Sequence, residues 1–389
     1  MRVIELRLQN NDENYVKMLR YKLAYISKDI VNISEEGASL HVHIEGDKFE
    51  EIEAALKRLV DELDDSYTGI TSDILYEKQS QNTFPDYDIY QALVDQKWIV
   101  PYESGLIGFG REFLELFKLL DQMFVNWGKR FGAVEYVYPD LIGIETLNQY
   151  HYIEQFPNHL MFASHLREDL DLIQSFSEKV SAGCDCYDTT YIDKPQLMNK
   201  LAICPHVYKQ YENQTIDLDE MLVVTSVGKC KRYESINMTK VERLLDFTMR
   251  EIVLVGSYEH VIKAREECIR LAINFIDQLG LEANIKSAND PFFTTKYSPK
   301  AMLQQKLKLK YELNLLLPYN NKELSVGSFN YHGIYFTEAF NINSSSGANV
   351  HTGCIAFGLE RFAYAILSQL GVDGAKFWME RQAETLLFS

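Results

Sequence analysis

The first 65 residues alternate between two hydrophobic patterns. Apolar residues at every second position predict strands in three segments: residues 3–8, 30–33 and 40–44. Apolar residues spaced three or four apart predict helices over residues 15–26 and 49–63. The polar, turn-rich stretch 64–88 predicts a linker. We therefore expect an N-terminal α+β accessory domain with its linker at residues 1–85.

The rest of the chain, residues 86–389, mixes long helical patterns with many short strands. Helices are predicted over residues 111–127, 259–279 and 359–370, and Gly280 and Gly371 end the last two. Strands are predicted in these segments: residues 133–138, 222–226, 228–234, 247–256, 282–286, 311–317, 323–331 and 351–357. Adjacent hairpins without regular βαβ alternation favour an α/β (α+β) fold, with an antiparallel sheet flanked by helices.

Two local features of this part bear on its structure. The apolar stripe of the helix at residues 111–127 belongs either to the core or to a dimer face. Residues 201–208 are predicted to form a short strand that ends at Cys204, because Pro205 cannot continue the pairing.

Composition narrows the class of protein. The chain has 389 residues, 46% of them hydrophobic and 24% charged, as in ordinary soluble proteins. No apolar run reaches the roughly 20 residues of a membrane span, and the start has no signal-peptide core, so no membrane association is expected. Six scattered cysteines favour a reduced, cytoplasmic protein. The net charge of −17 argues against extended nucleic-acid binding.

A candidate nucleotide site lies on the predicted hairpin 228–256. Arg232 and Glu234 point to one face of a strand, and Phe247 begins the returning strand. An arginine for phosphate, a glutamate for a base edge and an aromatic ring for stacking could together bind a nucleotide. The alternative is an ordinary cross-strand ion pair worth less than about 1 kcal/mol.

A second candidate site is the strand-to-helix segment at residues 351–362. Gly353 and Gly358 would let another chain or a ligand approach the backbone closely. Arg361 lies in the first turn of the helix, where a cation opposes the helix dipole, so we expect an anionic partner. That partner is either a structural carboxylate or a bound phosphate.

Taken together, these segments resemble the three signature motifs of class II aminoacyl-tRNA synthetases. The helix, strand and Pro139 resemble motif 1, the segment from Arg232 to Phe247 resembles motif 2, and residues 358–361 resemble motif 3. Within the class, the chain is most similar to the seryl branch and to its truncated relatives, the amino acid:[carrier protein] ligases. The likeness rests on these short segments: residues 156–158, 202–205, 230–234, 249–251, 288–293, 328–332 and 351–354. It covers roughly residues 100–370.

The resemblance implies roles for individual residues. Arg232 would hold the α-phosphate and the amino acid carboxylate, and Glu234 would accept a hydrogen bond from the adenine amino group. Phe247 and Arg361 would sandwich the adenine, with Arg361 also reaching the γ-phosphate of ATP. Glu323 would bind Mg²⁺, although Val326 replaces the hydroxyl residue that the synthetases carry three positions on.

The resemblance also implies a zinc site close to the amino acid. Cys204, Glu251 and Cys354 would bind Zn²⁺, and Glu251 and Asn330 would contact the substrate. Two thiolates and one carboxylate leave a fourth position open, as in catalytic zinc sites. The alternative is two buried cysteines and a surface glutamate.

Three functions remain open at this point. The first is activation of a small amino acid, glycine or alanine, with ATP, and its transfer to the phosphopantetheine thiol of a carrier protein by a homodimer; tRNA would then not be a partner. The second is a zinc-dependent seryl-tRNA synthetase, which predicts a cluster of Lys and Arg on residues 1–65. The third is a non-catalytic relative that only binds partners.

Overall fold

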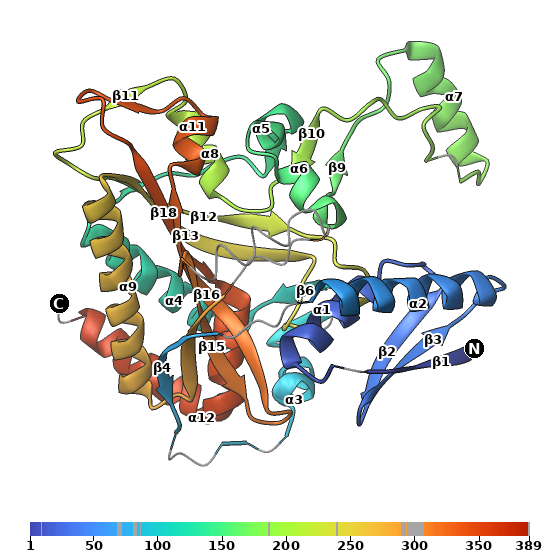
Figure 1. Ribbon diagram of the computed structural model, residues 1–389, viewed down its shortest axis with the longest axis horizontal. Helices are drawn as coiled ribbons and strands as arrows, with labels where there is room; N and C mark the ends of the chain where they lie inside the picture. The colour runs from blue at the N-terminus through green and yellow to red at the C-terminus, as the bar shows by residue number, and fades with distance from the viewer. Residues whose placement is uncertain are drawn as a thin grey trace.

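The computed structural model describes residues 1–8, 10–67, 72–80, 84–85, 87–185, 187–238, 240–288, 293 and 307–387. Figure 1 shows a small N-terminal unit beside a larger body built around one curved sheet. The segment 288–293, quoted above for its resemblance, lies outside the described residues except at its two ends. Within the described residues no helix is both long and apolar enough to span a membrane.

The N-terminal unit contains all five predicted elements. They are β1 (Arg2–Arg7), α1 (Glu13–Leu23), β2 (Ile30–Glu36), β3 (Ser39–Ile44) and α2 (Phe49–Ser66). The strands form an antiparallel sheet in the order β1-β3-β2. The helices pack on it around a core of its own that includes the fully buried Leu19, Val42 and Leu56.

The predicted linker is more ordered than its polar sequence suggests. It contains β4 (Ile74–Lys78), which pairs antiparallel with β14 (Ala283–Ser287) at one edge of the large sheet. The chain then continues through α3 (Ile89–Asp95) and the hairpin β5 (Ile99–Glu103) and β6 (Leu106–Phe109).

The large sheet has eight strands in the order β4-β14-β15-β16-β18-β13-β12-β7. The six strands not yet located are β7 (Val134–Glu135), β12 (Leu222–Lys231), β13 (Asp246–Gly256), β15 (Lys310–Leu317), β16 (Lys322–Gly333) and β18 (His351–Gly358). All neighbours pair antiparallel except β12 and β7, which are parallel. The predicted antiparallel sheet flanked by helices is confirmed.

Three long helices cover one face of this sheet (Figure 1): α4 (Arg111–Lys129), α9 (Tyr258–Leu279) and α12 (Leu359–Leu387). Phe113, Leu116 and Phe124 of α4 are completely buried within the chain's own main core. The apolar stripe on α4 is therefore core. Gly280 ends α9 with a φ of 67°, and Gly371 interrupts α12 with a φ of 70°, as the sequence predicted.

Smaller elements cover the opposite face, which we call the site face. They are β8 (Leu141–Gly143), α5 (Ile144–Gln149), α6 (Tyr152–Gln155), β9 (Phe162–Ala163), β10 (Leu197–Asn199), α8 (Cys204–Gln210), β11 (Thr215–Ile216), α11 (Tyr335–Ala339) and β17 (Asn343–Ser344). A further helix, α7 (Leu170–Ser181), extends away from the body (Figure 1). The predicted strand at residues 201–208 is wrong. Cys204 begins α8, because Pro205 is well suited to the first helical turn, where its missing N–H is not needed.

The two glycines of β18 have different surroundings. A Cβ on Gly353 would lie 2.9 Å from the carbonyl oxygen of Asn330 and 2.9 Å from Cγ1 of Val261. Gly353 therefore allows β18 to pack between β16 and α9, and its explanation by an approaching ligand is wrong. Among the described residues, a Cβ on Gly358 would meet only the Val326 carbonyl, at 3.9 Å, so these residues leave space there.

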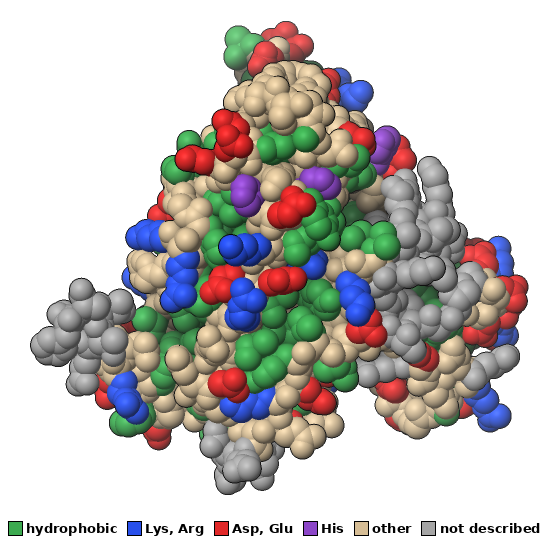
Figure 2. Space-filling model, turned by 60° about the vertical axis from the view of Figure 1, so that its left-hand side comes forward, with side chains coloured by type: hydrophobic (Ala, Val, Ile, Leu, Met, Phe, Trp, Pro, Cys, Tyr) green, Lys and Arg blue, Asp and Glu red, His purple; other side chains and the backbone are tan. Residues whose placement is uncertain are grey.

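Figure 2 shows the side of the molecule that lies on the left in Figure 1. Lys and Arg are interspersed there with Asp, Glu and apolar side chains. No continuous surface of one charge covers the described part of this side.

Candidate active site

Strand alternation brings the predicted site residues to the site face. In β18, Ile355 and Phe357 point into the main core beneath the long helices, whereas Cys354 and Ala356 belong to the second core on the site face. Neighbouring strands follow the same alternation, with Cys354 paired to Val253 and to Asn330. Residues more than a hundred positions apart therefore meet at the centre of the sheet.

Two cysteines and one glutamate, which we call the acidic trio, lie together at this centre. Ligand atoms of Cys204, Glu251 and Cys354 all lie within 4.8 Å of one another. The Cys354 thiol donates to Oε2 of Glu251 at 3.3 Å. The backbone N–H groups of Ile203 and Cys204, at the start of α8, donate to the two Glu251 oxygens at 2.9 and 2.8 Å. The helix start thus fixes the glutamate and brings Cys204 to it.

The electrostatics of this trio fit a bound cation. The pKa of Cys354 is raised well above its usual value by its hydrogen bond with Cys204, by burial and by the Glu251 charge. The pKa of Cys204 is also raised: the hydrogen bond with Cys354 lowers it, but burial and the Glu251 charge outweigh that effect. A divalent cation would stabilise both thiolates and remove this penalty. The trio could therefore hold a metal ion with one open position.

Asn330 lies directly beside the trio. Its side-chain amide donates to the Cys354 carbonyl at 3.1 Å and to the Ser328 hydroxyl at 3.0 Å. These bonds fix the amide on the strand next to the candidate metal ligands. A small molecule bound at the open metal position would meet it.

The nucleotide end of the site face begins where β12 ends. The Arg232 guanidinium lies over the Phe247 ring, 5.4 Å from its centroid, because β12 and β13 pair Cys230 with Phe247. Arg232 also donates two hydrogen bonds to the Leu201 carbonyl, at 3.1 and 2.9 Å. The arginine is thus held in one orientation on the sheet.

Glu234 lies among three arginines. It forms an ion pair with Arg243, a residue that the sequence did not single out. Burial raises the pKa of Glu234, but the charges of Arg243 and Arg361 outweigh it and hold that pKa below its usual value. The glutamate is therefore an ionised acceptor.

Arg361 is the third arginine of this cluster. Burial and the neighbouring Arg243 lower its pKa to about 10. Its guanidinium donates to the Ser325 carbonyl at 3.5 Å, and among the described residues no carboxylate forms an ion pair with it. The structural-carboxylate alternative for its partner is thus not realised within the described residues, which leaves room for an anion.

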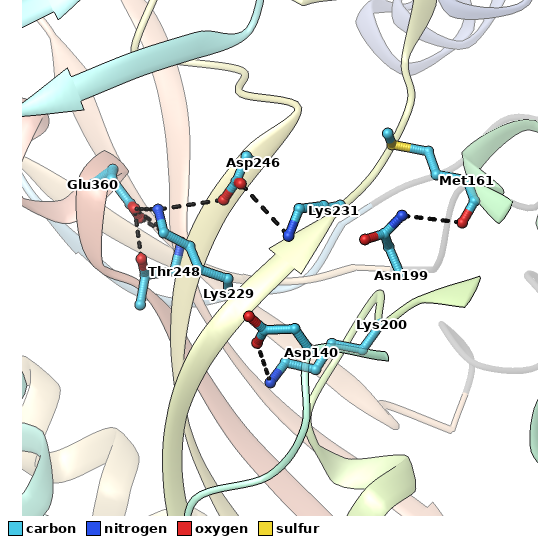
Figure 3. A network of polar contacts seen from close by, with 9 residues as sticks. All are labelled: Asp140, Met161, Asn199, Lys200, Lys229, Lys231, Asp246, Thr248 and Glu360. Carbon is cyan, nitrogen blue, oxygen red and sulfur yellow. Dashed lines mark hydrogen bonds and ion pairs between the residues drawn. The ribbon is translucent and has the colours of Figure 1, made fainter. Parts of the chain in front are cut away.

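Glu360 links β13 to α12 (Figure 3). These elements contain Phe247 and Arg361, which are predicted to sandwich the adenine. Its buried carboxylate accepts from the Thr248 backbone N–H at 2.9 and 2.8 Å and from the Thr248 hydroxyl at 2.7 Å. Thr248 follows Phe247 and Glu360 precedes Arg361, so these bonds fix the ring and the guanidinium relative to each other. The sequence offered one signal for Glu360: it is an acidic residue in the first turn of a helix, where a negative charge is favourable.

Lys200 anchors the end of motif 1 against β12 (Figure 3). Its buried ammonium lies 3.0 Å from Oδ1 of Asp140 and donates to the carbonyls of Tyr138 and Pro139. A Cβ on Gly228 would lie 2.6 Å from Nζ of Lys200, so the glycine in β12 makes room for the lysine.

Glu323 forms its contacts with neighbouring strands of the sheet. It is exposed on β16, where it pairs with Lys286 and accepts from the Asn284 amide at 2.6 Å. The charges of Glu234 and Glu312 raise the pKa of Arg361, but burial and the Arg243 charge outweigh them. The structure brings Arg232, Glu234, Phe247 and Arg361 together, and it pairs Glu323 with Lys286.

Comparison with known proteins gives two kinds of relative. The chain is 24% identical over 357 residues to the type-2 serine–tRNA ligase of Methanothermobacter thermautotrophicus, covering 87% of this chain and 67% of that protein. It is 31% identical over 238 residues to amino acid–[acyl-carrier-protein] ligase 2 of Bradyrhizobium diazoefficiens, covering 61% of this chain and 70% of that protein. No protein-family model matches the sequence.

A solved structure shares the fold. The Methanopyrus kandleri seryl-tRNA synthetase, crystallised with Aquifex aeolicus tRNASec, aligns with a TM-score of 0.70 at 19% identity, covering 95% of this chain and 74% of that one. The chain spans between 48% and 67% of the length of three type-2 serine–tRNA ligases that it matches.

Proposed function

Since the chain belongs to the class II aminoacyl-tRNA synthetase-like ligases, we propose that it activates a small amino acid with ATP and transfers it to the phosphopantetheine thiol of a carrier protein. In the first step the amino acid carboxylate attacks the α-phosphate, giving aminoacyl-adenylate and pyrophosphate. In the second step the thiol attacks the acyl carbon, AMP leaves with the bonding electrons, and the thiol proton is released. Glycine and alanine are the proposed substrates.

The observation that carries the proposal is the meeting of a fixed arginine cluster and an acidic trio on one sheet face. Arg232, held by the Leu201 carbonyl and stacked over Phe247, would bind the α-phosphate as charge develops on it. Arg361, without a carboxylate partner among the described residues, would cover the adenine and reach the γ-phosphate. Glu234 would accept from the adenine amino group. Glu323 remains the proposed Mg²⁺ ligand, and in its present position it would have to leave Lys286.

The acidic trio would select the amino acid. Cys204, Glu251 and Cys354 would hold a zinc ion, which would bind the amino group of the substrate at its open position. Asn330, whose amide is fixed beside Cys354, would contact the same substrate. Buried aromatic residues, including Tyr150 and Tyr208, pack around this part of the sheet. A small side chain fits such a site best.

A carrier protein as the acceptor is supported by the higher identity to the amino acid–[acyl-carrier-protein] ligase, 31% against 24%. The charge of the N-terminal unit points the same way. Residues 1–65 contain 9 Lys and Arg against 15 Asp and Glu, a formal net charge of −6. Such a unit repels the phosphate backbone of tRNA. Cytoplasmic location and a homodimer complete the proposal.

The second candidate is an unusual seryl-tRNA synthetase. One observation favours it: the match to the type-2 serine–tRNA ligase covers 87% of the chain and so extends into the first 85 residues, whereas the match to the carrier-protein ligase covers 61%.

Acceptor identity is tested directly with labelled amino acid. The full chain is incubated with ATP, Mg²⁺ and labelled glycine, alanine or serine, together with either a phosphopantetheinylated carrier protein or total tRNA. The proposal expects label on the carrier protein that is released by hydroxylamine, and none on the apo carrier protein that lacks the arm. Label on tRNA alone would establish the second candidate.

A further inference from the structure

The N-terminal unit contacts the catalytic body at the loop that carries the nucleotide residues. This loop, residues 232–245, joins β12 to β13 and includes a short 3-10 turn at Ser235–Asn237. Ile236 of the turn packs against the core of the N-terminal unit. The unit touches the loop with β2, with the end of α1 and with the two residues that follow α1, Ala24 and Tyr25.

The loop caps α1. The last carbonyls of a helix have no partner within the helix. Here the Ser235 hydroxyl donates to the Ala24 carbonyl at 2.9 Å, and the Asn237 side chain donates to the Tyr21 carbonyl at 3.3 Å. Ser235 has a φ of 53°, which a residue with a side chain adopts only when its surroundings impose it. The contact is therefore a specific one.

Tyr21 makes the contact that reaches the nucleotide end. The Arg243 guanidinium lies over its ring, 5.7 Å from the centroid. Its hydroxyl lies 2.7 Å from Nε2 of His159 and accepts from the Asn158 amide at 2.6 Å. One face of the tyrosine thus supports the arginine, while the hydroxyl fixes the ring to the catalytic body.

Arg243 connects this contact to Glu234. Its Nη1 donates to Oε2 of Glu234, the carboxylate to which we assign recognition of the adenine amino group. An arginine that is held on one carboxylate oxygen orients the carboxylate and leaves Oε1 to face the adenine. An arginine free to change rotamer would lose that orientation, because its side chain carries considerable rotamer entropy.

We infer that the N-terminal unit completes the adenine-recognition end of the site, with Tyr21 as a positioning residue that acts through Arg243 on Glu234. The inference rests on the proposed function. It assigns a role to residues 1–67 that needs no tRNA: the unit stabilises the loop by capping α1 and sets the geometry of nucleotide recognition.

Two substitutions separate the aromatic face of Tyr21 from its hydroxyl. Tyr21→Leu keeps apolar bulk but removes the ring under Arg243, and we expect KM for ATP in pyrophosphate exchange to rise about ten-fold, the range of a partly desolvated cation–π contact. The KM for the amino acid should stay within about two-fold, because the change acts only on the nucleotide end. Tyr21→Phe keeps the ring and loses only the hydroxyl, so its KM for ATP should stay closer to that of the unsubstituted chain.

A double-mutant cycle tests whether Tyr21 acts through Arg243. In an Arg243→Ala background, Tyr21→Leu should change KM for ATP very little, because the connecting residue is already gone. The preference for ATP over GTP should fall in both single variants, since Glu234 reads the adenine amino group. Tyr67→Phe is the matched control: it removes a tyrosine hydroxyl that donates to Asp12 inside the N-terminal unit at 2.6 Å.

The outcomes are distinguishable. The inference would be overturned if Tyr21→Leu had the same effect with and without Arg243→Ala. It would also be overturned if the Leu, Phe and unsubstituted chains had equal KM values for ATP. In both cases the proposed function stands as long as the unsubstituted chain catalyses exchange. Absence of exchange by the unsubstituted, zinc-loaded chain with every amino acid would overturn both. If Tyr21→Leu lowers the melting temperature far more than Tyr67→Phe does, the cycle is repeated with Tyr21→Phe and Tyr21→His. Equal KM values for His and Phe would then overturn the inference, because the two rings differ in how they support a cation.

Discussion

The two parts of the site face carry opposite charge. The acidic part calls for a cation, and the basic part calls for an anion. At the centre of the sheet, the pKa values of the Cys204 and Cys354 thiols are both raised beside Glu251, and this trio calls for a cation. At the nucleotide end, Arg232, Arg243 and Arg361 surround one glutamate, and the pKa of Arg361 is lowered. The basic end calls for an anion. An amino acid and a triphosphate supply these charges, with the amino group at one end and the phosphates at the other.

The two ends are also held in place by different groups. The acidic end is held by backbone N–H groups at the start of α8, which donate to Glu251. The basic end is held by side chains and by the N-terminal unit. Substitutions at the acidic end should therefore abolish metal binding. Each substitution at the basic end should weaken ATP binding without abolishing it.

The largest effect is expected at the acidic end. Cys354→Ser should lower pyrophosphate exchange by at least about 100-fold, because even groups that only orient metal ligands contribute about 10- to 100-fold. Zinc content, measured by inductively coupled plasma mass spectrometry, should fall in parallel. Cys184→Ser, at an exposed cysteine, is the control. Full exchange by Cys354→Ser, with or without a chelator, would remove zinc from the account.

The next effect is expected at the basic end. Arg361→Lys keeps the positive charge but loses the planar guanidinium, and kcat/KM for ATP should fall about 100-fold, as when one preorganised donor is removed. The KM for the amino acid should change little. Arg270→Lys, on the outer face of α9, is the control. A fall in kcat/KM for the amino acid alone would contradict the assignment of Arg361 to the nucleotide.

The paired glycines of β18 separate packing from ligand access. Gly353→Ala should destabilise the fold by about 2 kcal/mol, because its Cβ would press on the Asn330 carbonyl and on Val261. Gly358→Ala should leave stability unchanged but raise KM for ATP, since the space beside it is where we place the ligand. Urea unfolding and exchange kinetics on both variants measure this. Equal stability of the two would contradict the packing assigned to Gly353.

The smallest effect concerns His159, beside the basic end. Burial and the Arg232 charge lower its pKa to about 4, whereas an unfolded histidine has a pKa of about 6.5. Protonation therefore favours the unfolded chain, and stability is lost as pH falls from 6.5 toward 4. Between pH 6.5 and 5 the loss from this residue should be about 1.5 kcal/mol.

Two measurements check this value. The His159 imidazole resonances, assigned by comparison with His159→Gln, should show no titration above pH 5. The pH dependence of unfolding should be flatter in that variant. Titration of His159 near pH 6.5 would contradict its burial against Tyr21.

Sequence patterns predicted the parts of the fold in which local structure and burial agree. The two strands of the β12–β13 hairpin are rich in β-branched residues, and α9 combines a regular apolar face with Gly280 at its end, so both were predicted closely. Residues 201–208 were mistaken for a strand because a short apolar run has no period of its own. In β4 a polar segment becomes ordered only through pairing with β14, more than 200 residues away.

The site was predictable where a side chain acts through its own position in a motif. Arg232, Glu234, Phe247 and Arg361 belong to such motifs, and the structure brings them together. Arg243 and Glu360 were missed because their importance comes from a partner, Glu234 in one case and Thr248 in the other. Gly353 was misread because the sequence does not tell which neighbour approaches a glycine.

The most direct test of the central claim is ATP–pyrophosphate exchange by the full, zinc-loaded chain with each of the twenty amino acids. The account predicts exchange with glycine or alanine, little with amino acids that have large side chains, and loss of exchange on chelation that zinc restores. Exchange with a large amino acid would contradict a site for a small substrate. Exchange that persists without metal would contradict a zinc ion that binds the amino group.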